Sequence, residues 1–234
     1  MPEISQKSAQ RRIRRDRGTV LLTERDRQVL IWIIEQYAVR FDDVCFLLGR
    51  EAGPGAKASG RISESAARQV VARWQKAGWA ASRKMLVHEP AWVWVTAKGL
   101  HELGYNIKPY VPTVSRIAHL HAINDVRLRL AHKYPDYRWF SERRIRTALS
   151  YEKGATLPHL PDGYLRTPQG TTIAIEVELT PKKRDDVRLI LLDLLRSYHE
   201  VWYFVQDATI SVVTAAQKEL EPALAKRISI VRPE

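Results

Sequence analysis

The chain has 234 residues, 45% of them hydrophobic, which suffices for one large domain or two ordinary ones and excludes global disorder. Its 38 Lys and Arg residues against 26 Asp and Glu residues give a formal net charge of +12. That charge predicts a polyanionic partner, nucleic acid first and an anionic membrane surface second.

The residues that the chain lacks exclude two further classes of protein, those that insert into a membrane and those built on disulfides or cysteine-bound zinc. It contains no run of about 18 uninterrupted apolar residues, so insertion into a membrane is not expected. Cys45 is the only cysteine, which rules out an internal disulfide and a multi-cysteine zinc site and fits a reducing cytoplasm.

Residues 1–18 hold six Lys and Arg residues and almost no apolar side chain. Without an apolar core this segment is not expected to be a secretory signal. It is either a solvated tail or an arm that lies along phosphate groups.

The first folded segment, residues 19–104, is expected to hold three helices followed by a β-hairpin. Thr23 is a good N-cap for the first helix, because acidic residues follow it in the first turn. Ser63 caps the third helix and Gly78 ends it. The predicted helices comprise residues 21–37, 40–49, 63–79 and 96–104, a flexible loop rich in Gly, Ala and Ser comprises 50–60, and the hairpin strands comprise 79–87 and 92–95.

The third predicted helix carries small, amide and guanidinium side chains opposite its apolar stripe. Such side chains suit the reading of base edges in the major groove, and three helices followed by a hairpin are the pattern of a winged helix-turn-helix. The alternative is a small helical domain that binds protein, but the basic side chains favour DNA. The predicted DNA contacts are Arg61, Ser65, Arg68, Gln69, Arg73 and Lys76 on or beside the helix, Arg83 and Lys84 on the hairpin, and Arg11, Arg12, Arg14 and Arg15 in the arm.

Residues 105–113 contain two prolines and no periodicity, so they are predicted to be a linker. Residues 114–234 are expected to form an α/β domain in which helices flank a mixed sheet. The expected helices comprise residues 114–133, 182–198 and 214–226, and the expected strands comprise residues 137–146, 171–180, 200–206 and 227–232.

Three carboxylates stand out in this second domain against the basic background. Glu176 and Glu178 alternate with apolar residues on one predicted strand, so both face the same side of the sheet, about 6.5–7 Å apart. Asp162, in a Pro-Asp-Gly turn, leads toward a neighbouring strand. Carboxylates held together repel one another unless a cation neutralises them, and hard oxygen ligands suit Mg²⁺ or Mn²⁺. The alternative is an ordinary turn beside a surface pair of glutamates, whose side chains splay into solvent or pair with Lys182, Lys183 or Arg184.

Asp162 followed by Glu176-Val177-Glu178 resembles the PD-(D/E)xK nuclease superfamily. The resemblance implies that Asp162 and Glu176 bind Mg²⁺ and that the residue at position 178 helps to activate the attacking water. That residue is usually Lys, whereas this chain has Glu178, which some restriction endonucleases of the superfamily share. Glu178 is then a further metal ligand or orients the water, and Lys182 offsets charge on the phosphate.

A wider resemblance covers most of the chain. The predicted winged helix, then "HLHAINDVRLRL", "SERRIR", "HLPDGYL" and "IAIEVELTPK", together resemble the replication-relaxation family of plasmids and integrated mobile elements. The resemblance implies a role in replication or DNA relaxation, with Asn124, Asp125 and Glu142 near the site. His121 is expected to be a packing residue, whereas His159 is either a packing residue or a contact to phosphate or water.

Two functional readings follow. In the first, a winged helix delivers a nuclease-like domain to double-stranded DNA, which it nicks or cleaves with Mg²⁺ or Mn²⁺. In the second, the protein is a non-catalytic transcription or replication regulator that retains only the fold of the nuclease. A homodimer is compatible with both. No Ser-His-Asp order, Gly-rich phosphate loop or zinc spacing is present, so those reaction classes are set aside.

Overall fold

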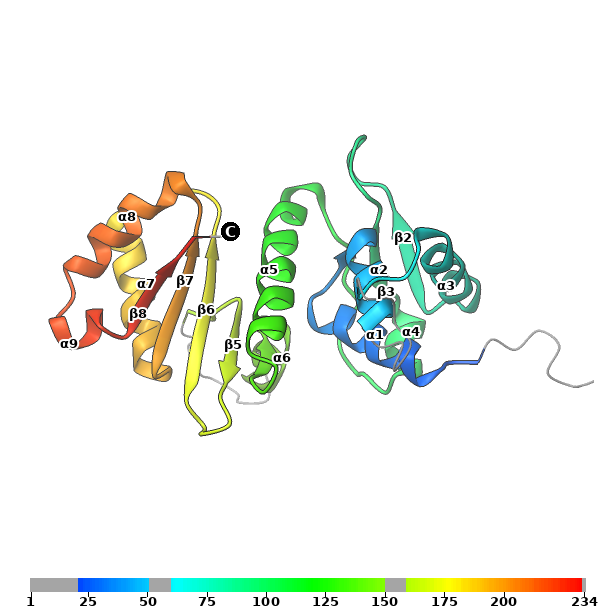
Figure 1. The fold of residues 1–234 in the computed structure, drawn as a ribbon, viewed down its shortest axis with the longest axis horizontal. Helices are drawn as coiled ribbons and strands as arrows, with labels where there is room; N and C mark the ends of the chain where they lie inside the picture. Colours follow the sequence, from blue (N-terminus) through cyan, green and yellow to red (C-terminus); the bar gives the residue numbers. More distant parts are fainter. Residues whose placement is uncertain (1–20, 51–59, 150–158, 233–234) are drawn as a thin grey trace, which may run out of the picture.

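The computed structural model of the protein describes residues 21–50, 60–149 and 159–232. These residues form a mixed helix-and-sheet structure of two units, each with its own sheet, and a long helix lies between them (Figure 1). The predicted arm with Arg11, Arg12, Arg14 and Arg15, and most of the predicted loop at residues 50–60, lie outside the described residues.

The first unit packs helices against a small antiparallel sheet whose strand order is β1-β3-β2. Its apolar core lies between the helices and this sheet, and Trp74 is completely buried there. The elements are α1 (Glu24–Glu35), β1 (Val39–Arg40), α2 (Phe41–Arg50), α3 (Glu64–Ala77), β2 (Ala80–Arg83), β3 (Trp92–Val95) and α4 (Ala97–Glu102).

The helix ends of this unit follow the predicted capping residues. Thr23 forms a reciprocal capping box with Asp26, and the Ser63 side chain accepts a hydrogen bond from the backbone amide of Ala66. Gly78 ends α3 with a φ of 75°, in the left-handed region that glycine enters without strain. The predicted boundaries of these helices are therefore confirmed to within a few residues.

The second unit contains a five-stranded mixed sheet with the order β4-β5-β6-β7-β8. The first three strands are antiparallel neighbours, and the last three are parallel neighbours joined through helices. The elements are β4 (Arg138–Ser141), α6 (Glu142–Leu149), β5 (Gly163–Arg166), β6 (Thr172–Glu178), α7 (Arg184–Ser197), β7 (Glu200–Val205), α8 (Asp207–Lys218), α9 (Pro222–Ala225) and β8 (Ile228–Val231).

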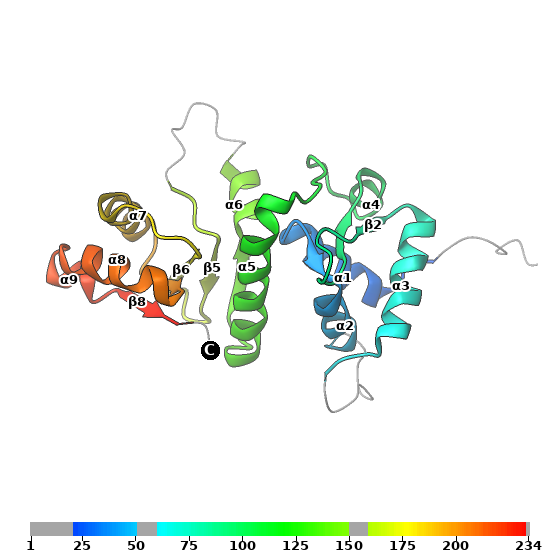
Figure 2. The same ribbon diagram turned by 90° about the horizontal axis from the view of Figure 1, so that it is seen from above.

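Helices cover this sheet from both sides (Figure 2). The alternation predicted for β6 is confirmed, because Ile175 and Val177 pack in the core that includes residues of α5 (Val114–Lys133), whereas Ala174 packs in the core that α7 and α8 form. Glu176 and Glu178 therefore face the α7 and α8 side.

Helix α5 lies between the two units in both views (Figures 1 and 2). Ile123 and Val126 pack against the large sheet, whereas Ile117 and Leu120 pack against Trp92 of the first unit. A helix that is buried on two sides has no single apolar stripe. Although α5 has 20 residues, neither it nor any other helix of the described ranges is long and apolar enough to cross a bilayer.

Polar contacts join the two units as well. Asn124 of α5 donates to the Ala38 carbonyl at 2.9 Å and accepts from the Gln36 side chain at 3.2 Å. Residues 105–113 contain no helix or strand, but they pack along this junction rather than standing apart from it. Further contacts across the junction are Arg127 to Glu35, Tyr37 to Glu142, Arg40 to His121, and Arg143 to the carbonyl of Ile34. Arg143 also donates to the carbonyl of Lys108, which lies in residues 105–113.

Two predicted elements of the second unit were wrong in extent. The strand predicted for residues 137–146 ends at Ser141, whose hydroxyl accepts a hydrogen bond from the Arg144 amide and begins α6. The helix predicted from residue 214 begins at Asp207 and is interrupted after Lys218, so α8 and α9 replace it.

Candidate functional site

Asp162 is held at the edge where β5 begins beside β6. Its Oδ2 accepts a hydrogen bond from the Val177 amide at 2.9 Å, which fixes the carboxylate against the strand that carries Glu176. On its other side, Oδ1 lies 2.9 Å from Nε2 of His119 on α5. Hydrogen bonding to Asp162 raises the pKa of His119 against the opposing effect of burial.

Glu176 is only 5% exposed, on the face of β6 that is directed toward α7. Its Oε1 lies 2.6 Å from Nε2 of His159. Burial, followed by repulsion from Asp162, raises the pKa of Glu176 to about 7. The hydrogen bond to Glu176 in turn raises the pKa of His159. The structure thus brings Asp162 and Glu176 within electrostatic reach of each other and pairs each with an imidazole.

Glu178 takes a different direction from Glu176. Its Oε2 lies 2.5 Å from Nζ of Lys182 and accepts a hydrogen bond of 3.4 Å from the hydroxyl of Tyr203. Burial, and then the charges of the two glutamates, raise the pKa of Tyr203. Neither glutamate is exposed to solvent, but the pair between Glu178 and Lys182 is one that the structural alternative predicts.

The predicted three-carboxylate arrangement is therefore assembled only in part. Asp162 and Glu176 are together, but Glu178 is paired elsewhere. Among the residues that the structure describes, no group of three or more His, Cys, Asp and Glu side chains is placed to hold a metal ion. The metal site therefore stays a prediction.

His119 was not singled out from the sequence, although it contacts Asp162 directly. Sequence reasoning could have identified His119 from its position in the first turns of a predicted helix, because the register of that helix places His119 over the end of the sheet. His159 was singled out, and the structure pairs it with Glu176 rather than leaving it exposed.

The residues that the family resemblance implied near the site lie mostly at the junction of the units. The Glu142 amide does donate to the Asp162 carbonyl at 3.1 Å, but its side chain does not approach the carboxylates. The side-chain contacts are Asn124 with Gln36, Asp125 with Arg129, and Glu142 with Tyr37 and Arg146.

The predicted DNA-contacting face of α3 is on the surface. Arg68 pairs with Glu64 one turn before it and lies 5.5 Å from the ring centroid of Phe41, and the side chains of Arg68 and Glu64 are about two-thirds exposed, at 70% and 67%. An exposed pair of this kind contributes little to stability and releases its arginine readily. The exposed residues of this surface are Arg61, Ser65, Arg68, Gln69 and Lys76, together with Arg83 at the end of β2 and Lys84 after it.

Arg73 is an exception among the predicted DNA contacts. Its Nη2 lies 2.5 Å and 2.6 Å from the two carboxylate oxygens of Asp26, whose side chain is 0% exposed. The Trp74 indole donates to the same carboxylate at 2.9 Å. Arg73 therefore neutralises a buried acid, which is a structural task within the first unit.

Comparisons with known proteins were made by family model, by curated sequence and by solved structure. None of the three gives a match to this chain.

Proposed function

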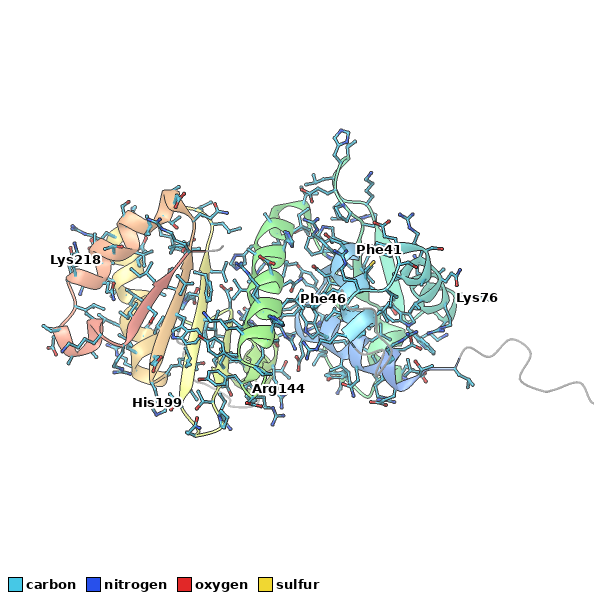
Figure 3. The ribbon with its side chains drawn as sticks, viewed as in Figure 1. Phe41, Phe46, Lys76, Arg144, His199 and Lys218 are labelled. Atoms are coloured by element: carbon cyan, nitrogen blue, oxygen red, sulfur yellow. The ribbon has the colours of Figure 1, made fainter. Side chains whose placement is uncertain are left out.

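We propose that this protein binds double-stranded DNA through a winged helix-turn-helix in which α3 enters the major groove. The observation that carries the proposal is the free outer face of α3. This face is directed away from the large sheet, and Lys76 projects outward from it (Figure 3). The exposed side chains along it are of the types that hydrogen-bond to base edges and phosphates.

The segment between β2 and β3 supports the same reading. It projects beyond the body of the first unit next to α3 (Figure 1). Arg83 and Lys84 are exposed at its base, and Val87 is 75% exposed near its tip. In a winged helix this segment would lie along the backbone or in the minor groove while α3 reads bases.

The first prediction tests this surface with Arg68→Ala. If Arg68 contacts a base, the substitution should weaken binding to the preferred sequence by about 1–3 kcal/mol and relax the preference at that position. Selection of a preferred duplex from a random pool, followed by anisotropy titrations, gives both quantities. Lys218→Ala is the matched control, because Lys218 is exposed on α8 at the opposite end of the molecule (Figure 3). Equal losses in the two variants would remove α3 from the interface.

A second candidate function is metal-dependent cleavage of DNA by the second unit, as in the nuclease superfamily that its motifs resemble. One observation favours it: Asp162 lies close enough to Glu176 to raise its pKa. Divalent cations relieve such repulsion. A role in the replication or relaxation of a plasmid or integrated element belongs to this proposal, and a non-catalytic DNA-binding regulator is the alternative outcome.

The second prediction tests the metal with Glu176→Gln. If Mn²⁺ binds Asp162 and Glu176, it should raise the melting midpoint of the wild type but not of this variant, because a bound ligand stabilises only the folded state. Glu178→Gln is the informative companion, since Glu178 is paired with Lys182 and should keep the Mn²⁺ response. A nicking assay on supercoiled plasmid with either metal accompanies the melts. A wild-type midpoint that Mn²⁺ does not move would favour the regulator.

A further inference from the structure

Three arginines converge on a single aromatic ring in the second unit. The guanidinium carbons of Arg138, Arg144 and Arg166 lie 5.1, 4.9 and 5.3 Å from the ring centroid of Phe140. They come from β4, α6 and β5, so the fold and not the local sequence gathers them. All three side chains belong to exposed residues, whereas Phe140 beneath them is only 9% exposed.

Among the described residues, acids do not balance the positive charge of this group. Within the described residues, Arg138 and Arg166 take part in no ion pair, and Arg144 has only a 3.8 Å approach to Glu35. Arg138 and Arg166 also face each other directly across the β4–β5 ladder. Like charges at such opposed positions are destabilising, so the arrangement costs stability unless an anion lies over it.

The arginine group shares its sheet face with the carboxylate site. Trp139 on β4 and Leu165 on β5 point to the α5 side. Side chains alternate along a strand, so the residues directly before and after Trp139 and Leu165 point to the opposite side, where Glu176 also lies. Tyr164 stacks on Phe140 at 4.5 Å and contacts Tyr198 at 5.4 Å. The charge of Glu176 contributes to the raised pKa of Tyr198, after burial and Tyr164. The arginine group therefore lies on the same face of the sheet as Glu176, and ring contacts lead from Phe140 through Tyr164 to Tyr198.

We propose that Arg138, Arg144 and Arg166 form a second nucleic-acid surface, which binds the phosphate backbone of DNA without reading its sequence. Guanidinium groups hydrogen-bond phosphate oxygens in pairs, and the stacked aromatic rings below hold them in place. The inference rests on the proposed DNA-binding function but concerns a different unit from α3. DNA bound here would lie on the face of the sheet that carries Glu176, whether or not the DNA is cleaved.

The third prediction uses the double variant Arg138→Gln, Arg166→Gln on the full-length protein. Loss of two phosphate contacts should reduce the slope of log Kobs against log salt by about 1.8, and affinity for a random duplex by about 60-fold at about 0.1 M salt. The ratio of specific to non-specific affinity should stay unchanged, in contrast to Arg68→Ala. The charge-matched control is Lys218→Gln, Lys226→Gln, which removes two exposed lysines beside α8 and α9.

Folding is monitored by the melting midpoint, which should not fall in the arginine variant because a repulsive cross-strand pair is removed. A second variant, Arg138→Lys, Arg166→Lys, retains the charge and should recover most of the salt slope.

The outcomes separate the two proposals. A glutamine variant that binds like its control overturns the arginine surface but leaves α3 binding intact. A wild type that binds no DNA overturns both. Binding to phosphatidylserine vesicles that the variant loses, with DNA affinity unchanged, assigns the surface to a membrane and overturns the proposal.

Discussion

Asp26 is a completely buried acid whose carboxylate organises the first unit. Burial alone would raise its pKa, but hydrogen bonds from Thr23 and Trp74, together with the Arg73 charge, outweigh burial and lower the pKa. The ionised form is therefore the one that the folded state prefers. Residue patterns identified Thr23 as a cap, but they could not show that Arg73 reaches this acid across 47 residues of sequence.

The fourth prediction follows from this carboxylate. Because the folded-state pKa of Asp26 lies below its ordinary value of 3.8, its contribution to stability is present above that pH and is lost as pH falls through the lower, folded-state pKa. Asp26→Asn should lower the free energy of unfolding by about 2–3 kcal/mol at neutral pH. This loss is at or below the usual one for a broken buried ion pair, because the Arg73 side chain is 36% exposed.

Denaturant titrations of both proteins between neutral pH and about pH 3 provide the measurement, over the range in which ordinary carboxyl groups titrate. The difference between wild type and variant should shrink toward acid pH. A difference that stays constant across the range would show that Asp26 does not act through its charge.

At the scale of elements, α5 is the helix that determines how the units meet. Its polar residues at the junction are buried: Asn124 is 0% exposed and Arg127 is 9% exposed. Arg127 lies 2.7 Å from Glu35 and 4.4 Å from the ring centroid of Trp32. Burial lowers its pKa to about 10, with Glu35 acting in the opposite direction. The first unit is thus held to α5 by contacts that are largely buried.

The fifth prediction concerns this junction. Arg127→Ala should destabilise the protein by about 3–5 kcal/mol, because Glu35 would lose its 2.7 Å partner inside the interface and keep only the 3.8 Å approach of Arg144. In calorimetry the wild type should unfold in one transition and the variant in two, since the units would no longer be coupled. Arg196→Ala is the control, because Arg196 pairs with Asp193 on the surface of α7 and is 75% exposed. A single transition at the wild-type midpoint in both variants would contradict the coupling.

The same scale shows which elements could be predicted from the sequence. Caps and alternation are local, so the ends of α3 and the facing of β6 followed from the residues themselves. The start of α8 did not, because Thr209, Ile210, Val212 and Val213 favour strands and only packing against β7 and β8 makes them helical. Ser141 ends β4 by a hydrogen bond that no periodicity reveals.

At the scale of the whole molecule, most elements were predictable, although β1, α6 and β5 were not, and the contacts between elements were not predictable either. The carboxylates were found because acids stand out on a basic chain, but their partners come from distant elements: His119 from α5 and His159 from the approach to β5. The arginine group could not be predicted from the sequence either, because β4, α6 and β5 each contribute one of its residues. Contacts over long sequence separations depend on the register of packed elements, which pattern analysis does not supply.

The shared core around α5 bears on how such a protein can change over evolution. Trp92 and Ala38 from one side and Ile117 and Leu120 from the other bury one another, so a chain divided at residues 105–113 would expose apolar surface on both halves. Neither half could therefore be exchanged as an independent module. If the proposed DNA binding holds, a new DNA specificity would have to arise by substitution along α3, because exchange of the whole first unit would also require a matching α5.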